Sequence, residues 1–136
     1  MSNSVDLHQK KLEEDFEILE SWEDRYRQII DLGRKLPVFP EDQKIDSNLV
    51  QGCQSRVWIY IKFENNKVKI FGDSDAHITK GLVALLINLY DDAYAHEIAN
   101  HQTDLFLKKL NLHEHLSPTR SNGLNGMVNR LKILTK

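Results

Sequence analysis

Apolar and polar residues alternate through the segment 54–64. Every second residue from Val57 to Phe63 is a branched aliphatic or an aromatic residue. This period of two predicts a strand, because successive side chains of a strand point to opposite faces. Asn65-Asn66 then predicts a hairpin turn, since asparagine tolerates positive φ, and residues 67–71 supply the return strand. The segment 45–50 is expected to add a third strand.

The segment before this hairpin has helical spacing. Apolar residues three to four positions apart predict a helix over residues 7–19. Ser21, followed three residues later by Asp24, predicts the cap of a second helix. Pro37 and Pro40 are expected to end that helix and to open a connecting loop.

The segment after the hairpin is also predicted to be helical. Residues 76–90 are apolar nearly all round, which is typical of a helix in the middle of a core. We expect the sequence Gly72-Asp73-Ser74-Asp75 to end the preceding strand and to supply the capping side chains of this helix. Short helices are expected over residues 95–100 and 104–110, and Ser117-Pro118 predicts the start of a final helix.

The elements follow one another in blocks of helices, strands and again helices. Such segregation is typical of an α+β fold, here a small antiparallel sheet of about three strands flanked by helices. The chain has 136 residues, which predicts a single domain over residues 1–136.

Charge and composition narrow the class of protein. The 18 basic and 20 acidic residues give a net charge of −2, which argues against binding to a nucleic-acid backbone. The longest apolar run, residues 81–87, is too short to span a membrane, and the polar N-terminus does not resemble a signal peptide. One cysteine cannot form an internal disulfide. We therefore expect a soluble protein of the reducing cytoplasm.

No metal site is expected from the histidines. His96 and His101 are five residues apart, so they do not share a helix face as zinc ligands do, and both are interpreted as surface residues. The sequence His113-Glu114-His115 is interpreted as a polar loop. Asp73 and Asp75 are interpreted as capping residues rather than as a catalytic pair.

Cys53 is the only cysteine and the strongest candidate for chemistry. Free cysteines are often small buried hydrophobic residues, so an inert Cys53 is one interpretation. The local sequence favours another, because Cys53 lies in a polar turn just before the strand. Gly52 removes a side chain beside the sulfur and permits a tight or positive-φ backbone.

The presence of a single cysteine excludes two kinds of site and leaves two kinds of chemistry. An iron–sulfur cluster normally needs about four protein ligands, and a dithiol oxidoreductase normally needs a second cysteine. A cysteine hydrolase, with His77 or His115 as the base, remains open. A sulfur carrier also remains open, since its one thiolate can attack the outer sulfur of a persulfide.

Four separated segments resemble the SufE family, including its CsdE branch. They occur in the family's order and span roughly residues 22–131. The segments are Trp22-Glu23-Asp24-Arg25-Tyr26 with Leu32-Gly33-Arg34-Lys35-Leu36-Pro37, Gly52-Cys53-Gln54-Ser55-Arg56-Val57-Trp58, Gly72-Asp73-Ser74-Asp75-Ala76 with Lys80-Gly81-Leu82, and His115-Leu116-Ser117-Pro118-Thr119-Arg120-Ser121-Asn122-Gly123-Leu124.

This resemblance implies a fold, a role and a site. The fold would be similar to the IscU scaffold. Cys53 would form a persulfide, with Gly52 and Gln54 beside it. Asp75 would affect the exposure of the thiol, and Arg120 would take part in contact with the partner. We also expect Cys53 to pack partly under apolar neighbours and to swing out when a partner docks.

The resemblance further implies partners rather than independent catalysis. The protein would accept sulfur from a SufS-like cysteine desulfurase, stimulate it, and deliver the sulfur to a SufBCD-like scaffold complex in iron–sulfur cluster assembly. Pyridoxal phosphate would belong to the desulfurase, so no cofactor is expected in this chain. A homodimer is a further possibility that the sequence leaves open, as are the hydrolase and inert-cysteine interpretations.

Overall fold

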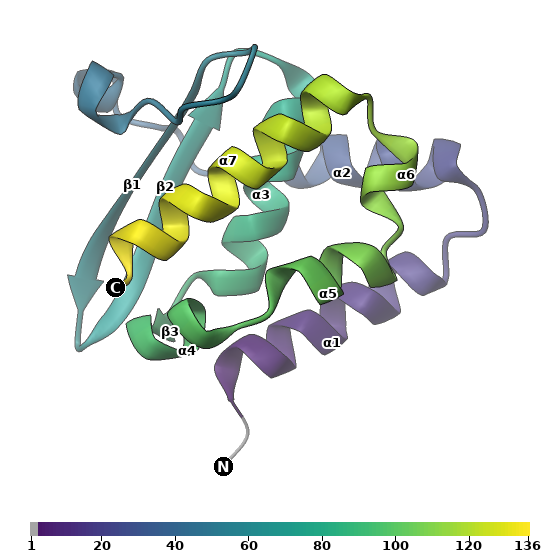
Figure 1. The fold of residues 1–136 in the computed structure, drawn as a ribbon, viewed down its shortest axis with the longest axis horizontal. Coiled ribbons are helices and arrows are strands. Elements are labelled where there is room, and N and C mark those ends of the chain that lie inside the picture. Colours follow the sequence, from purple (N-terminus) through teal and green to yellow (C-terminus); the bar gives the residue numbers. More distant parts are fainter. Residues whose placement is uncertain (1–2) are drawn as a thin grey trace.

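The computed structural model describes residues 3–136 and has an α+β fold, as the sequence predicts. Its sheet has the order β1-β2-β3 and is antiparallel throughout. The strands are β1 (Val57–Glu64), β2 (Lys67–Ser74) and β3 (Ala93–Tyr94). Figure 1 shows the long β1–β2 hairpin at one side of the molecule and the helices beside it.

The hairpin forms where the period of two predicts it. β1 and β2 pair from Val57 opposite Ser74 to Glu64 opposite Lys67. The turn consists of Asn65 at φ 52° and Asn66 at φ 68°, so both residues adopt the left-handed conformation that a two-residue hairpin needs. The predicted turn is therefore confirmed.

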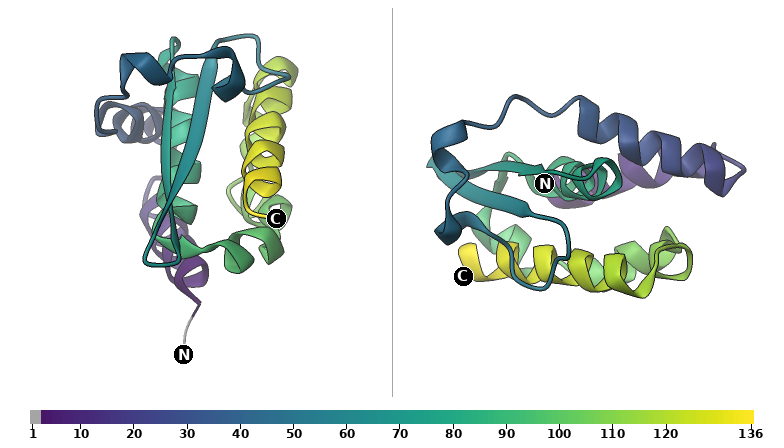
Figure 2. Two further views of the ribbon diagram at one scale, coloured as in Figure 1. Left: turned by 90° about the vertical axis from the view of Figure 1, so that its left-hand side faces the viewer. Right: turned by 90° about the horizontal axis from the view of Figure 1, so that it is seen from above.

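The core forms around α3 (His77–Tyr90), in which nine of the 14 residues are buried. One face of β2 packs on this helix. Gly72 makes the close approach possible, because a Cβ atom at this position would lie 2.5 Å from Cγ1 of Val83. The apolar character of α3 all round is explained by its neighbours, which lie on several sides of it (Figure 2).

Two helices precede the sheet, α1 (Ser4–Glu17) and α2 (Trp22–Arg34). The backbones of α2 and α3 touch at a pair of glycines. A Cβ on Gly33 would lie 2.9 Å from the amide nitrogen of Gly81, and a Cβ on Gly81 would lie 2.3 Å from the carbonyl oxygen of Ile29. No larger residue fits at either position without separating the two helices.

Four helices follow the sheet: α4 (Ala95–Asn100), α5 (Thr103–Lys109), α6 (Leu112–His115) and α7 (Pro118–Leu134). The α7 helix begins where Ser117-Pro118 predicts it, and the Ser117 side chain accepts a hydrogen bond from the Arg120 amide. Seen from above, α2 and α7 lie on opposite sides of α3 and the sheet (Figure 2).

Several expected boundaries are wrong. The third strand is β3 and not the segment 45–50, which forms a 3-10 turn at Asp46–Asn48 and a single bridge between Leu49 and Trp58. The first helix spans Ser4–Glu17 rather than residues 7–19, and β1 begins at Val57 rather than at residue 54.

The interpretation of residues 72–75 is also wrong. Residues 72–74 continue β2, and α3 begins without a side-chain cap. Asp73 instead forms ion pairs with Lys44 and Lys80, at 3.6 and 3.3 Å. Glycine usually weakens a strand, but the close approach of α3 to β2 requires Gly72 here.

Two histidine interpretations need correction as well. His113 and His115 belong to the short helix α6 rather than to a loop. His101 is half-buried and links α1, α3 and the end of α4, since its ring nitrogens form hydrogen bonds with the hydroxyl of Tyr90 at 2.7 Å and the amide oxygen of Gln9 at 2.6 Å.

Within residues 3–136, no helix has the length and apolar character needed to cross a membrane.

Candidate functional site

Cys53 lies in the short loop between Leu49, which bridges to Trp58, and the start of β1 at Val57. The loop is closed at its base by a hydrogen bond of 2.8 Å from the Val50 amide to the Val57 carbonyl. Gly52 has φ 89°, a conformation that other residues adopt only with strain. The sequence therefore places the thiol at a tight turn, as the setting after Gly52 predicts.

The loop rests on the first half of α7, where two glycines leave space for it. A Cβ on Gly126 would lie 2.4 Å from the carbonyl oxygen of Gln51, and a Cβ on Gly123 would lie 3.4 Å from Sγ of Cys53. The Cys53 thiol donates a hydrogen bond of 3.4 Å to the Gly123 carbonyl. These glycines fix how closely the sulfur approaches the helix.

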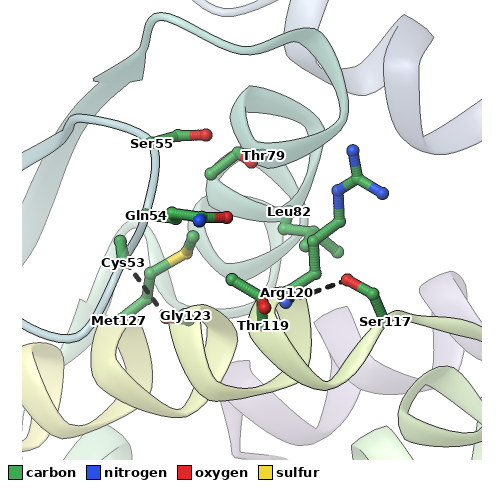
Figure 3. Close-up of a pocket in the computed structure, with 10 residues that line it drawn as sticks. All are labelled: Cys53, Gln54, Ser55, Thr79, Leu82, Ser117, Thr119, Arg120, Gly123 and Met127. Atoms are coloured by element: carbon green, nitrogen blue, oxygen red, sulfur yellow. Dashed lines mark hydrogen bonds between the residues drawn. The ribbon is translucent and has the colours of Figure 1, made fainter.

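A cavity of about 200 Å³ adjoins the thiol, and three parts of the fold line it (Figure 3). The Cys53 loop forms one side, the first turns of α3 form the back, and the first half of α7 forms the floor. The lining residues are Cys53, Gln54, Ser55, Thr79, Leu82, Ser117, Thr119, Arg120, Gly123 and Met127. The cavity thus combines a few apolar side chains with hydroxyl groups and one guanidinium.

The thiol is half-buried and packs against the hydrophobic core, as expected. Burial raises the pKa of the Cys53 thiol above its ordinary value, because the thiolate would lose hydration. The protein at rest therefore keeps this group mainly as the neutral thiol near neutral pH.

Arg120 supplies the positive charge at the cavity. The residue is exposed, and its guanidinium forms no ion pair with a carboxylate within residues 3–136. Figure 3 shows its side chain rising from α7 beside the cavity. The fold brings Arg120 and Cys53 together, although they are 67 positions apart in the chain.

Asp75 lies outside the cavity and holds the far end of the loop. Its carboxylate accepts a hydrogen bond of 3.1 Å from the Arg56 amide, and its own amide donates one of 3.3 Å to the Arg56 carbonyl. The hydroxyl of Ser74 donates to the same carbonyl at 2.8 Å. The segment 53–56 is therefore attached to the end of β2 by three hydrogen bonds, two of which involve Asp75.

No histidine is placed to act as a base for Cys53 within the described residues 3–136. Neither His77 nor His115 lines the cavity, and the hydrogen bond of the thiol goes to a main-chain carbonyl. The ring of His115 stacks instead on Trp22, with 3.8 Å between ring centroids. Because a cysteine hydrolase needs an imidazole within reach of the sulfur, this arrangement counts strongly against the hydrolase interpretation. The same part of the chain also contains no cluster of three residues suited to bind a metal.

Of the expected site residues, Cys53, Gln54 and Arg120 line the cavity, while Gly52 and Asp75 shape the loop. The sequence did not single out Thr79 or Met127, which occupy helix faces that only the packing of α3 and α7 selects, whereas Leu82 lies in the third resembling segment. Ser117, Thr119 and Gly123 lie in the fourth resembling segment, so their proximity to Arg120 in the chain was the available signal.

Comparison with known proteins shows which family this chain resembles. Residues 10–135 match the family model of SufE, described as an Fe-S metabolism associated domain. An uncharacterized SufE-like protein of Rhizobium meliloti (strain 1021) is 42% identical over 123 residues, which cover 88% of each chain. The cysteine desulfuration protein SufE of Wigglesworthia glossinidia brevipalpis is 41% identical over 118 residues, or 86% of this chain and 82% of that protein.

A solved structure supports the same fold. The solution structure of a hypothetical protein from Thermus thermophilus superimposes with a TM-score of 0.79, covering 94% of this chain and 93% of that one. At 22% identity, this likeness concerns the fold alone. The extent of the family match and the two close relatives show that the chain belongs to the SufE family.

Proposed function

We propose that this protein accepts sulfur from a cysteine desulfurase and carries it as a persulfide on Cys53 for iron–sulfur cluster assembly. The observation that carries the proposal is the half-buried thiol on a glycine turn, beside a cavity lined by Arg120 and, within residues 3–136, by no histidine. Membership of the SufE family and the identity with a cysteine desulfuration protein support the same role.

The proposed transfer is a displacement at sulfur. The thiolate of Cys53 attacks the outer sulfur of a cysteine persulfide on the desulfurase, and a new S–S bond forms as the donor's S–S bond breaks. The donor cysteine leaves as a thiolate and takes up a proton, while the proton of the Cys53 thiol passes to solvent. The step needs no external oxidant or reductant, since one disulfide-type bond replaces another.

The raised pKa of Cys53 gives the partner a specific task. At rest the thiol is neutral and hydrogen-bonded to the Gly123 carbonyl, so it is a poor nucleophile. We infer that docking draws the loop away from α7 and exposes the sulfur to the donor. The Gly52 turn allows this movement, and return of the loop would shield the persulfide from oxidation.

In this proposal the chain has no catalytic cofactor of its own. The pyridoxal phosphate that releases sulfur from free cysteine is bound by the desulfurase, which is of the SufS type. The sulfur then passes from Cys53 to a scaffold complex of the SufBCD type. The protein therefore increases the turnover of its partner by removing the partner's persulfide.

The test is the intact mass of the protein after incubation with a SufS-type desulfurase and free cysteine. We expect one added sulfur atom on the native chain and none on Cys53→Ser. The turnover of the desulfurase should rise with the native chain and not with the variant. A sulfur atom gained by Cys53→Ser would refute the proposal. A native chain that gains no sulfur and leaves the partner's turnover unchanged would refute it as well.

A further inference from the structure

The start of α7 is attached to α2 by an aromatic contact that the transfer chemistry does not use. The imidazole of His115 stacks on the indole of Trp22, with 3.8 Å between centroids and 12° between planes. The hydroxyl of Tyr26 donates a hydrogen bond to the main-chain carbonyl of His115. The first turns of α2 therefore hold both the ring and the backbone of one residue.

The contact is itself held from both sides. Nδ1 of His115 donates to the Asn111 carbonyl at 3.0 Å, which fixes the ring orientation. The guanidinium of Arg25 lies 5.3 Å from the Trp22 ring, and its Nε donates to the Leu19 carbonyl at 3.0 Å. Trp22 is thus ordered by its own helix as well as by His115. His115 is exposed and Trp22 is half-buried, so the stack lies at the surface, where these contacts from both helices hold it.

This stack lies immediately before the residues of the cavity. His115 is the last residue of α6, and Ser117 caps α7 only two positions later. The Ser117 hydroxyl accepts the Arg120 amide at 3.2 Å, so the anchor, the cap and Arg120 follow one another within six residues. His115 is therefore placed to act on the start of α7, the part of the helix that carries the guanidinium.

We propose that Trp22 and His115 are positioning residues, which set the place of the Arg120 guanidinium at the cavity that adjoins the Cys53 thiol. Their importance for sulfur transfer rests on the proposed function. Their effect on Arg120 does not, because it concerns only the electrostatic environment of the thiol and can be measured without a desulfurase.

The measurement compares two alkylating reagents, iodoacetate and iodoacetamide, on the native chain with its single cysteine. A nearby guanidinium attracts the anionic reagent and leaves the neutral one unaffected, so the ratio of the two rates reports the position of Arg120. At low salt a single charge that lines the same cavity changes such a ratio by roughly twofold. Arg120→Gln calibrates the loss.

We expect His115→Ala to lower the ratio as Arg120→Gln does, and His115→Phe to restore it, because phenylalanine can still stack on Trp22. The double variant His115→Ala with Arg120→Gln should lower the ratio no further than Arg120→Gln alone. His96→Ala is the matched control. It removes another stacked imidazole, on Tyr94 at 5.8 Å between centroids, and should leave the ratio unchanged.

A simple loss of stability would give a different pattern. It would raise both alkylation rates together and leave their ratio unchanged, and that result for His115→Ala would overturn the proposal. An additive effect in the double variant would overturn it as well. If His115→Ala does not fold, Tyr26→Phe provides the same test, because it removes only the hydrogen bond to the His115 carbonyl and should lower the ratio by a smaller amount.

Discussion

The sulfur of Cys53 lies 3.4 Å from the carbonyl oxygen of Gly123, a residue 70 positions further along the chain. This contact joins a loop to a helix through one weak hydrogen bond, and it places the thiol where burial disfavours the thiolate. The reactivity of Cys53 therefore depends on how firmly the loop rests on α7.

The pH dependence of alkylation tests this arrangement directly. Because burial raises the pKa of Cys53, the native thiol should ionise at higher pH than the same thiol in the unfolded chain. The rate of reaction with iodoacetamide should thus have its midpoint at higher pH in native protein than in denaturant. A native midpoint at or below that of the unfolded chain would contradict the burial.

The same shift has a consequence for stability. The folded state holds the Cys53 proton more tightly than the unfolded state does. The raised pKa therefore contributes to the free energy of unfolding, and this contribution is fully present below the unfolded pKa. It is lost as the pH rises through the folded value. Cys53→Ala should remove this part of the pH dependence of the free energy of unfolding, measured in denaturant from neutral to alkaline pH.

The two glycines of α7 offer a matched pair of variants. Gly126→Ala forces a Cβ to within 2.4 Å of the Gln51 carbonyl, and Gly123→Ala places one 3.4 Å from the Cys53 sulfur, which is ordinary contact. Both gain about 1 kcal/mol of helix propensity. The clash at Gly126 costs about 1–3 kcal/mol, so only this variant should fail to gain stability.

The loop should also respond differently to the two substitutions. Gly126→Ala displaces the backbone of residue 51, and we expect faster alkylation of Cys53 than in Gly123→Ala. Denaturant unfolding and iodoacetamide kinetics on the two variants together give the answer. Equal effects at the two positions would show that the loop does not rest on α7 as described.

Asp75 should restrain the thiol from a distance. Asp75→Ala removes the acceptor of the Arg56 amide, a hydrogen bond worth about 1 kcal/mol, so opening of the loop and alkylation of Cys53 should increase by about fivefold. Asp75→Asn keeps an acceptor and should lie near the native rate. Asp73→Ala, which breaks two ion pairs at the end of β2 and removes no hydrogen bond to Arg56, serves as the control.

Because His101 is half-buried, we expect the protein to lose stability in mild acid. Burial and then the nearby Lys132 lower its pKa, so the folded state favours the neutral ring between Tyr90 and Gln9. This contribution is present above the unfolded pKa and is lost as the pH falls through the folded value. The burial of Tyr90 raises the pKa of its phenol to about 12, so that partner stays protonated throughout.

Denaturant unfolding at about pH 7.5 and about pH 5.5 measures this effect, since histidine is the group that titrates between them. His101→Gln should show a smaller difference between the two conditions than the native chain. His96→Gln alters an exposed ring and should keep the native difference. The proposed role of His101 fails if both variants behave alike.

Sequence patterns predicted the elements that local chemistry determines. The hairpin was predictable because its alternation and its Asn65-Asn66 turn are both local signals. The third strand was not, because β3 has only two residues and pairs with Lys67 and Val68 through the position of α3. The end of β2 was wrongly predicted at Gly72 for a similar reason. This glycine lets α3, which is distant in the pairing pattern, approach the strand, and local sequence does not show that contact.

The candidate site divides along similar lines. Cys53 and Arg120 carry reactive groups in distinctive segments, so sequence alone could single them out. Thr79, Leu82 and Met127 are ordinary helix residues whose proximity to the thiol arises only when α3 and α7 pack together. The stack of Trp22 on His115 had no sequence signal beyond the presence of both residues in resembling segments.

The contact between Gly33 and Gly81 has a consequence for the cost of docking. The backbones of α2 and α3 are in direct contact and the Ile29 side chain packs beside them, so a change in the tilt of either helix would open a gap in the core. The frame that carries both Trp22 and Thr79 therefore contributes little configurational entropy to any transition. We therefore expect the change in conformational order on binding a partner to fall on the short loop that carries the sulfur.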